Sequence, residues 1–328
     1  MVVTSNVLLI GGMGLGVIAA LSLEASCRAQ ITVVLRSNYK LVKQNGYDIK
    51  SCDHGKMEGW SPTKIVHQVP HVSSNDRPYD YIVITTKNIL NTGPGMAELI
   101  IPAVSFGKTV IVLIQNGLNI ERPYLERYPY NIILSGISFA GSQEIKPGVI
   151  EHCYHDNLLV SAFRTQNVDI TREQEAAKSF VSLYAASGKA SCFHTAETIS
   201  RRWEKLVYNA IINPLCAITN LDSGYLRQSG SAMVKIIRDA MEEVIAAAAA
   251  AGYTLPPDTA QELLKDDPIE SHFEPSTLQD IRKGNSIEYE YLVGEPMREG
   301  LHLGVPMPTI SMIYAMCQAV QNRVRAIK

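Results

Sequence analysis

The chain lacks several features that would assign it to a class at once. Its 328 residues carry a formal net charge of −2, so there is no excess of positive charge to attract nucleic acid or an anionic membrane surface. No apolar run approaches the length of a membrane-spanning helix. The short apolar run at residues 7–10 passes directly into glycines, unlike a signal peptide. We therefore expect a cytoplasmic protein without nucleic-acid or membrane partners.

Cysteine and histidine are present without the spacing of metal ligands. The six cysteines include no C-x-x-C pair, which is typical of reduced thiols and not of a disulfide framework or a zinc site. His67 and His71 are four residues apart, but a proline between them disfavours a helical metal-binding pair. His152 and His155 have no third ligand at a suitable spacing. From these spacings we expect no bound metal.

The first half of the chain alternates strand and helix signals. Such alternation predicts βαβ units and a Rossmann-like, doubly wound α/β sheet. The predicted strands cover residues 7–10, 31–35, 81–85, 109–114, 131–135, 149–152, 158–162 and 190–194, and helices cover 15–27, 37–44 and 171–187.

The character of the sequence changes near residue 195, where strand signals end and long amphipathic patterns begin. We therefore expect two domains: a Rossmann-type nucleotide-binding domain over residues 1–195 and an all-α substrate-binding and catalytic domain over 196–328. The predicted helices of the second domain cover residues 196–219, 229–251, 278–282, 286–301 and 308–327.

A glycine cluster follows the first predicted strand and opens a helix, which is the location of a dinucleotide-binding fingerprint. Free N–H groups at such a helix start favour a pyrophosphate. The motif departs from G-x-G-x-x-G, because its middle glycine is a methionine, whose side chain either obstructs the diphosphate or points away from it. Tight packing alone is the structural alternative. The predicted cofactor-binding run is Gly11, Gly12, Met13, Gly14, Leu15 and Gly16.

The end of the second predicted strand indicates which dinucleotide would bind. An NAD-binding domain usually carries an acidic residue here for the ribose hydroxyls, whereas this chain has Arg36 and Ser37. A guanidinium can pair with the 2′-phosphate of NADPH, and a hydroxyl can hydrogen-bond to it. The alternative is an arginine that is simply solvated. The pattern favours NADPH as the cofactor.

Two further strand ends carry polar residues. Thr86 and Lys87 follow one strand, and Asn116 follows another in the run Gln115-Asn116-Gly117. Ligands of open α/β sheets bind beyond the carboxyl ends of the strands. We therefore expect Thr86 near the cofactor and Lys87 and Asn116 near both cofactor and substrate, although Asn-Gly is also a common turn pair.

A polar stripe crosses an otherwise apolar helical stretch. Lys205, Asn209 and Asn213 are spaced four residues apart, so a continuous helix would align them on one face. A buried cation and two amides require partners. An acidic, carbonyl-bearing substrate would supply them, and a structural network closed by backbone carbonyls is the alternative.

These motifs, taken in order, resemble those of the ketopantoate reductases (2-dehydropantoate 2-reductases), and the style of the chain is similar to fungal members. The resemblance extends over nearly the whole length. It rests on the glycine turn, Arg36-Ser37, Thr86-Lys87, Gln115-Asn116-Gly117, the block Lys205-x-x-x-Asn209-x-x-x-Asn213-Pro214, Ser276 with Asp280, Glu288, and the run Gly304-Val305-Pro306-Met307-Pro308.

The resemblance implies an NADPH-dependent reduction of a 2-keto acid, most simply 2-dehydropantoate to pantoate in pantothenate biosynthesis. By position, Lys205 would be the general acid, and Glu288 would hydrogen-bond a substrate hydroxyl and help hold the lysine. Asn209, Asn213 and Ser276 would bind substrate hydroxyl and carboxylate groups. The family also implies a helical domain like that of 6-phosphogluconate dehydrogenases, a substrate in the cleft between the two domains, and a possible homodimer.

Two departures from the family pattern keep other functions open. Met13 replaces the middle glycine, and Phe273 stands where many members carry a substrate-binding asparagine. A site that has lost a polar anchor can accept a more apolar ketone. The chain could therefore be a reductase turned to another ketone in secondary metabolism, or a protein that keeps the lysine site without hydride chemistry.

Overall fold

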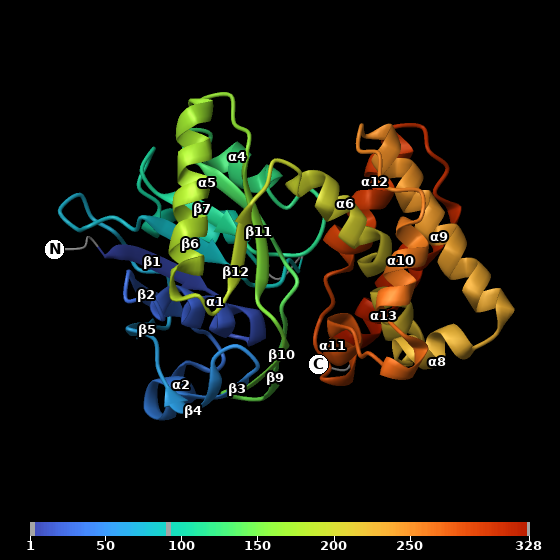
Figure 1. Cartoon of the computed structure of the whole chain (residues 1–328), viewed down its shortest axis with the longest axis horizontal. Helices are drawn as coiled ribbons and strands as arrows, with labels where there is room; N and C mark the ends of the chain where they lie inside the picture. Colours follow the sequence, from blue (N-terminus) through green and yellow to red (C-terminus); the bar gives the residue numbers. More distant parts are fainter. Residues whose placement is uncertain (1–3, 90–92, 327–328) are drawn as a thin grey trace. The chain divides into compact units, whose positions relative to one another are not determined.

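The computed structural model describes residues 4–89 and 93–326, which form two compact units (Figure 1). The sheet unit comprises Met1–Thr86, Pro94–Gln115 and Glu121–Thr198. The helical unit comprises Lys87–Gly93, Asn116–Ile120 and Ile199–Lys328.

The division differs from the expected one at 195/196, because two short segments of the first half belong to the helical unit. The segment Asn116–Ile120 shows the physical reason. Leu118 is buried in the core of the helical unit, and its backbone N–H donates to the carbonyl of Tyr291 at 2.9 Å. The chain leaves the sheet after a strand, adds this segment to the helical unit and then returns.

The sheet unit is built on an eight-stranded sheet with the order β12-β11-β8-β7-β6-β1-β2-β5. β1 pairs in parallel with both β2 and β6, which gives the doubly wound arrangement expected from the sequence. β11 pairs antiparallel with β8 and parallel with β12. The strands are β1 (Ser5–Ile10), β2 (Ala29–Val34), β5 (Lys64–Val66), β6 (Tyr81–Ile84), β7 (Val110–Leu113), β8 (Ile133–Ser138), β11 (Asn157–Phe163) and β12 (Ser191–His194).

A second, four-stranded sheet has the order β4-β3-β10-β9. Its strands are β3 (Tyr47–Ser51), β4 (Gly55–Trp60), β9 (Gly141–Lys146) and β10 (Val149–Tyr154). The sequence predicted only the last of these. The others are partly exposed, and β4 has no buried residue in its run, so they lack the apolar runs that identified the main sheet.

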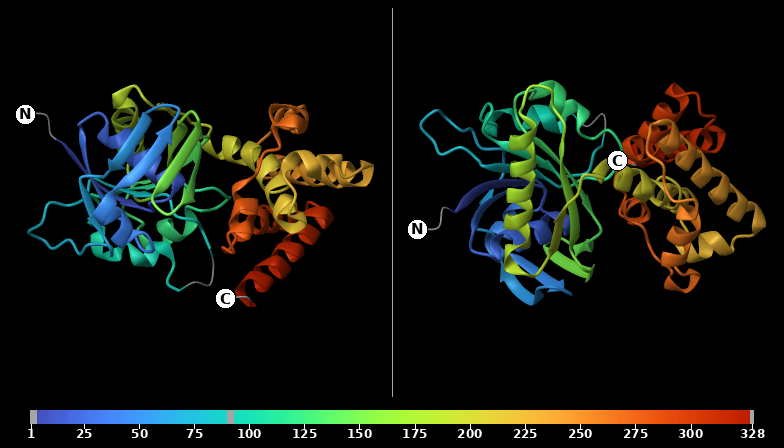
Figure 2. Two further views of the ribbon diagram at one scale, coloured as in Figure 1. Left: turned by 90° about the horizontal axis from the view of Figure 1, so that it is seen from below. Right: turned by 45° about the horizontal axis from the view of Figure 1, so that its top comes forward.

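Helix α1 (Gly14–Glu24) is buried along nearly its whole length, from Gly14 to Leu23 with one partly buried position. It contacts β2 of the main sheet and also β9 and β10 of the second sheet, so it needs no polar face. The other helices of the unit are α2 (Tyr39–Asn45), α3 (Met96–Leu99), η1 (Ile101–Ala103), α4 (Arg122–Arg127), α5 (Ile170–Tyr184) and η2 (Ala185–Ser187). Figure 2 shows the ribbon of the chain in two further views.

The helical unit packs around its own apolar core, which includes Trp203 at 1% exposure. Its elements are α6 (Thr198–Asn209), α7 (Ile212–Thr219), α8 (Ser223–Gln228), α9 (Ser231–Ala250), α10 (Thr259–Asp266), η3 (Ile269–Ser271), α11 (Ser276–Arg282), the π-helical turn η4 (Glu290–Gly294), α12 (Glu295–His302) and α13 (Pro308–Ala326). Ile327, the predicted last residue of the final helix, lies outside the described residues. Among the described residues, no helix combines the length and the hydropathy that are needed to span a membrane.

The single helix predicted over residues 196–219 is wrong, because the structure divides it into α6 and α7 at Ala210 and Ile211. Pro214 follows closely and has no N–H to continue the ladder. The N–H of Ile211 instead reaches back three residues to Tyr208 at 3.1 Å, which tightens the end of α6. Asn213 therefore lies on a different helix from Lys205 and does not continue a straight stripe.

Candidate active site

In the glycine turn between β1 and α1, the first and last glycines, Gly11 and Gly16, leave no room for a side chain. Gly11 has φ +114°, a conformation that favours glycine. A Cβ on Gly16 would lie 1.9 Å from the carbonyl oxygen of Gly11. Because these two glycines close the turn, the fingerprint runs from Gly11 to Gly16.

Met13 therefore occupies the middle-glycine position of the motif. Its backbone is extended, with φ −104° and ψ 177°, and the residue is 47% exposed. The residues beside it are crowded: a Cβ on Gly12 would meet the side chain of Leu35, and one on Gly14 would meet the carbonyl of Ser142. Met13 is thus exposed to solvent, whereas a side chain at Gly12 or at Gly14 would collide with its neighbours.

The turn meets the chemical requirements of a diphosphate cradle. Helix α1 begins at Gly14 and has eleven residues, so its first N–H groups and its dipole favour an anion. Leu15, next in the helix, is partly buried. Arg36 and Ser37 lie just beyond β2, separated from it by the buried Leu35, and both are exposed. A guanidinium and a hydroxyl are therefore accessible beyond the carboxyl end of that strand.

The carboxyl ends of neighbouring strands are tied together by side chains. The hydroxyl of Thr85 donates to the carbonyl of Gly11 at 3.1 Å, and the Gln115 amide donates to the carbonyl of Thr86 at 2.5 Å. The hydroxyl oxygen of Thr86 is buried and has no hydrogen-bond partner among the described residues. Such an orphaned group at the strand edge indicates a place for a ligand.

Lys205, the predicted general acid, belongs to the helical unit. It lies on α6, is partly buried, and its ammonium donates to the Asn116 side-chain oxygen at 2.9 Å. Burial, and then the positive charge of Arg202, lower the pKa of Lys205 from 10.5 to about 8, while the Glu288 carboxylate opposes that shift. Arg202 itself donates to the carbonyl of Gly117 at 2.9 Å and so anchors the segment that carries Asn116.

Glu288 is the second titratable group of the cluster and is 8% exposed. Its carboxylate accepts the backbone N–H of Asn88 at 2.8 Å. Burial raises the pKa of Glu288 from 4.5 to about 7, and Asp280 adds to the rise. Lys87, the Asn88 N–H and Lys205 act in the opposite direction. Lysine and glutamate therefore both titrate near neutral pH.

Lys87 forms an ion pair with Asp280, whose side chain is 6% exposed. Burial raises the pKa of Asp280 even though the lysine beside it acts to lower it. From the sequence we expected Lys87 to meet cofactor and substrate, and the pairing was not foreseen. The aspartate was visible in the S-x-x-x-D pattern, but nothing in that spacing identifies a lysine 193 residues away as its partner.

The three remaining predicted substrate-binding residues have different surroundings. Asn213, on α7, is 7% exposed, and its side-chain oxygen has no hydrogen-bond partner within residues 4–89 and 93–326. Asn209, at the end of α6, is partly buried. Ser276 is exposed and begins α11. The side-chain oxygen of Asn213 is therefore a buried acceptor that a hydroxyl or N–H group of a ligand could satisfy.

Phe273 lies in a loop that is fixed to the helices around it and is 37% exposed. Its carbonyl accepts the N–H of Ser223 at 3.0 Å. Earlier in the same loop, the Asp267 carboxylate accepts the hydroxyl of Tyr208 at 2.7 Å. Tyr208 lies on α6 between Lys205 and Asn209, so the loop is attached to the helix that carries this lysine.

The arrangement can supply a proton to a developing oxyanion. An ammonium with a pKa about one unit above neutral is mostly protonated and is still a competent acid. Its negative neighbour stabilises the charged form, and the amide of Asn116 fixes its position. A proton donor of this kind and, in the sheet unit, a glycine turn of the dinucleotide-binding type are each features found in oxidoreductases that act on carbonyl groups.

Comparison with known proteins agrees with that class. The family model described as ketopantoate reductase PanE/ApbA matches residues 7–165, and its C-terminal counterpart matches residues 197–321. The chain therefore belongs to the ketopantoate reductase family.

Individual relatives cover nearly the whole chain. An uncharacterized protein of Saccharomyces cerevisiae is 34% identical, over 99% of this chain and 96% of its own length, in keeping with a fungal-type member. A crystal structure of 2-dehydropantoate 2-reductase from Methylococcus capsulatus is 26% identical, covers 97% of each chain and has a TM-score of 0.80. D-mandelate dehydrogenase, solved with NADH and anilino(oxo)acetate, is 19% identical with a TM-score of 0.82, over 98% of this chain and 99% of its own.

The raised pKa of Glu288 makes stability depend on pH. The folded state keeps the carboxyl proton up to about pH 7, whereas the unfolded chain loses it near 4.5. This contribution to stability is present below 4.5 and is lost as the pH rises through 7. We predict that the free energy of unfolding of the wild type, relative to Glu288→Gln, falls by about 3 kcal/mol across that window. Urea titrations of both proteins measure it, and a difference that does not change with pH contradicts the assignment.

Proposed function

We propose that the protein reduces a 2-keto acid to a 2-hydroxy acid with NADPH, and that 2-dehydropantoate is its substrate. The observation that carries the proposal is the partly buried ammonium of Lys205, held at 2.9 Å by Asn116 and with a pKa lowered to about 8. Family membership supports the reaction class, and the exposed Arg36 supports the choice of cofactor.

The cofactor, when bound, supplies a hydride to the carbonyl carbon of the substrate. Negative charge then develops on the carbonyl oxygen, and Lys205 stabilises it by a charged hydrogen bond before giving it a proton. Asn116 accepts one of the ammonium protons and so fixes the position of the proton donor. The lowered pKa makes the proton easier to transfer than that of an ordinary lysine.

Glu288 and the asparagines would orient the substrate. A carboxylate, or a carboxyl that shares its proton, can bind a substrate hydroxyl, and Glu288 also favours the charged form of Lys205. The orphaned side-chain oxygen of Asn213 can accept a second hydroxyl proton. Asn209 and Ser276 offer donors for the substrate carboxylate.

A second candidate substrate is a 2-keto acid with an apolar or aromatic substituent. Phe273 presents an exposed ring where many family members carry an amide, and an aromatic surface favours an apolar group over a hydroxyl. The similar fold of D-mandelate dehydrogenase, solved with anilino(oxo)acetate, shows that this architecture accommodates an aromatic ligand in that protein. Rates on 2-dehydropantoate and on aryl-substituted keto acids distinguish the two candidates.

Replacing Lys205 by alanine removes the proton donor. We predict a loss of at least about 100-fold in kcat for NADPH-dependent keto-acid reduction, the range expected for general acid catalysis. Lys235→Ala is the matched control, because this lysine is exposed on α9 of the same unit, and it should retain the wild-type rate. Near-wild-type turnover by the Lys205 variant would remove that residue from the mechanism.

Arg36→Ala tests the cofactor. If the guanidinium pairs with the 2′-phosphate, the KM for NADPH should rise by at least about tenfold, equivalent to about 1.4 kcal/mol, while the KM for NADH stays unchanged. Arg28→Ala is the control, because this exposed arginine precedes the opposite end of β2. Equal effects on the two coenzymes, or no effect on either, contradict NADPH selection by Arg36.

A further inference from the structure

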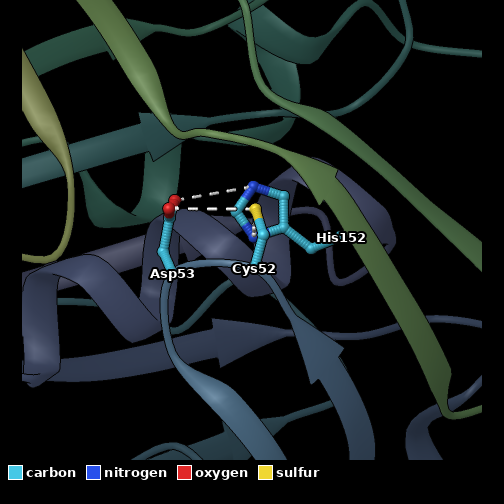
Figure 3. Close-up of side chains that lie close together, drawn as sticks. All are labelled: Cys52, Asp53 and His152. Carbon is cyan, nitrogen blue, oxygen red and sulfur yellow. Dashed lines mark hydrogen bonds and ion pairs between the residues drawn. The ribbon is translucent and has the colours of Figure 1, made fainter.

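A cluster of metal-ligand side chains lies in the sheet unit and takes no part in the proposed reduction. It forms where β3 and β10 run parallel, with Ser51 beside His152 in the register. The backbone N–H of Cys52 continues the ladder by donating to the carbonyl of His152 at 2.9 Å. The turn after β3 thus places Cys52 and Asp53 against a histidine about 100 residues away in sequence (Figure 3).

The spacing of the three side chains is close to that around a single metal ion. The Asp53 carboxylate is 3.8 Å from Nε2 of His152, and the Cys52 sulfur is 3.8 Å from the other oxygen of Asp53. The sulfur also lies 3.9 Å from Nδ1 of His152. One ligand atom from each residue falls within 4.8 Å of the others. Ligands of a tetrahedral zinc ion are roughly 3.3–3.8 Å apart, given its bond lengths.

His152 has an unsatisfied ring nitrogen that points into this cluster. The residue is 2% exposed, and its Nε2 has no hydrogen-bond partner among the residues described. Its other nitrogen, Nδ1, lies 2.8 Å from the hydroxyl oxygen of Ser51. The Ser51 oxygen also accepts the backbone N–H groups of Asp53 at 3.2 Å and of His54 at 3.0 Å. Metal binding at Nε2 requires the tautomer with the proton on Nδ1, which leaves a buried lone pair on Nε2. A metal ion satisfies that lone pair, and the second nitrogen is then held as in known metal–histidine sites.

The Asp53 carboxylate is held in place by neighbours outside the cluster. It accepts the backbone N–H of Asp156 at 2.8 Å and a hydrogen bond from the exposed His155 ring at 2.7 Å. The Asp156 side chain adds nearby negative charge, and one of its oxygens is buried without a partner in the described part of the chain. Carboxylates facing a buried imidazole lone pair attract a cation.

We propose that Cys52, Asp53 and His152 bind one zinc-class transition-metal ion. The ligands would be the cysteine thiolate, a carboxylate oxygen and Nε2 of the histidine, with the fourth position taken by water. Binding releases the thiol proton to solvent. A thiolate with an imidazole selects zinc or cobalt over magnesium and calcium. The ion would join the β3–β4 turn to β10.

The test titrates Zn²⁺ and Co²⁺ into the full-length, chelator-treated, reduced protein, with calorimetry for stoichiometry and affinity. The expected result is one equivalent of metal and, with Co²⁺, the intense visible bands of a four-coordinate site together with thiolate charge transfer. Cys52→Ser and Asp53→Asn should each weaken binding by at least about 100-fold, because even the loss of a supporting group commonly costs 10- to 100-fold.

Control variants separate this site from ordinary surface thiols. Cys27→Ser alters another exposed cysteine of the same unit and should leave the affinity and the cobalt spectrum unchanged. His152→Gln should abolish binding, and circular dichroism reports whether that buried variant still folds. If it does not fold, the exposed Cys52 variant decides the matter. Absence of binding, a six-coordinate cobalt spectrum, or equal losses in the Cys27 and Cys52 variants would overturn the proposal. None of these outcomes depends on reductase activity.

Discussion

The partly buried positive charge of Lys205 is the physical constraint on which the proposed site in the helical unit depends. The Lys205 ammonium would be costly there without partners, and the structure supplies them from separate parts of the chain. Asn116 comes from a segment that leaves the main sheet, and Glu288 comes from the approach to a π-helical turn. Arg202, one turn earlier in α6, is a like charge that acts against them and lowers the pKa of the lysine. Lys87 and Asn88, like the segment Asn116–Ile120, are grouped with the helical unit. Their polar groups act on this lysine and on its glutamate.

The balance of charges in that cluster suits acid catalysis. Burial alone moves the lysine toward its neutral form and the glutamate toward its protonated form. Each then moderates the shift in the other, so that the two pKa values come to about 8 and about 7. The ion pair between Lys87 and Asp280 contributes a second lysine and a second carboxyl, which act on Glu288 in opposite senses. Two groups that titrate near neutrality make the cluster suited to proton transfer at physiological pH.

Much of the fold could be predicted from the sequence, because its main signals are local. The apolar runs of the parallel strands, the glycine turn at Gly11 and the change to helical periodicity after residue 195 each depend on neighbouring residues. Three strands of the second sheet were missed because they are partly exposed and carry no continuous apolar run. The break between α6 and α7 was missed because the polar spacing suggested one continuous helix, although Pro214 was a signal for it. Contacts such as Lys87 with Asp280, or Cys52 with His152, depend on strand register and chain topology, which spacing along the sequence does not reveal.

The central claim is that Lys205 is an acid with a strongly lowered pKa, and an NMR titration tests it most directly. Lysines carrying ¹³C at the ε position report their own protonation, and comparison with Lys205→Arg assigns the resonance. The account predicts that this signal titrates near pH 8, well below the 10.5 of an ordinary lysine. A signal that stays fully protonated through pH 9.5 (about a unit below the ordinary value) would contradict it.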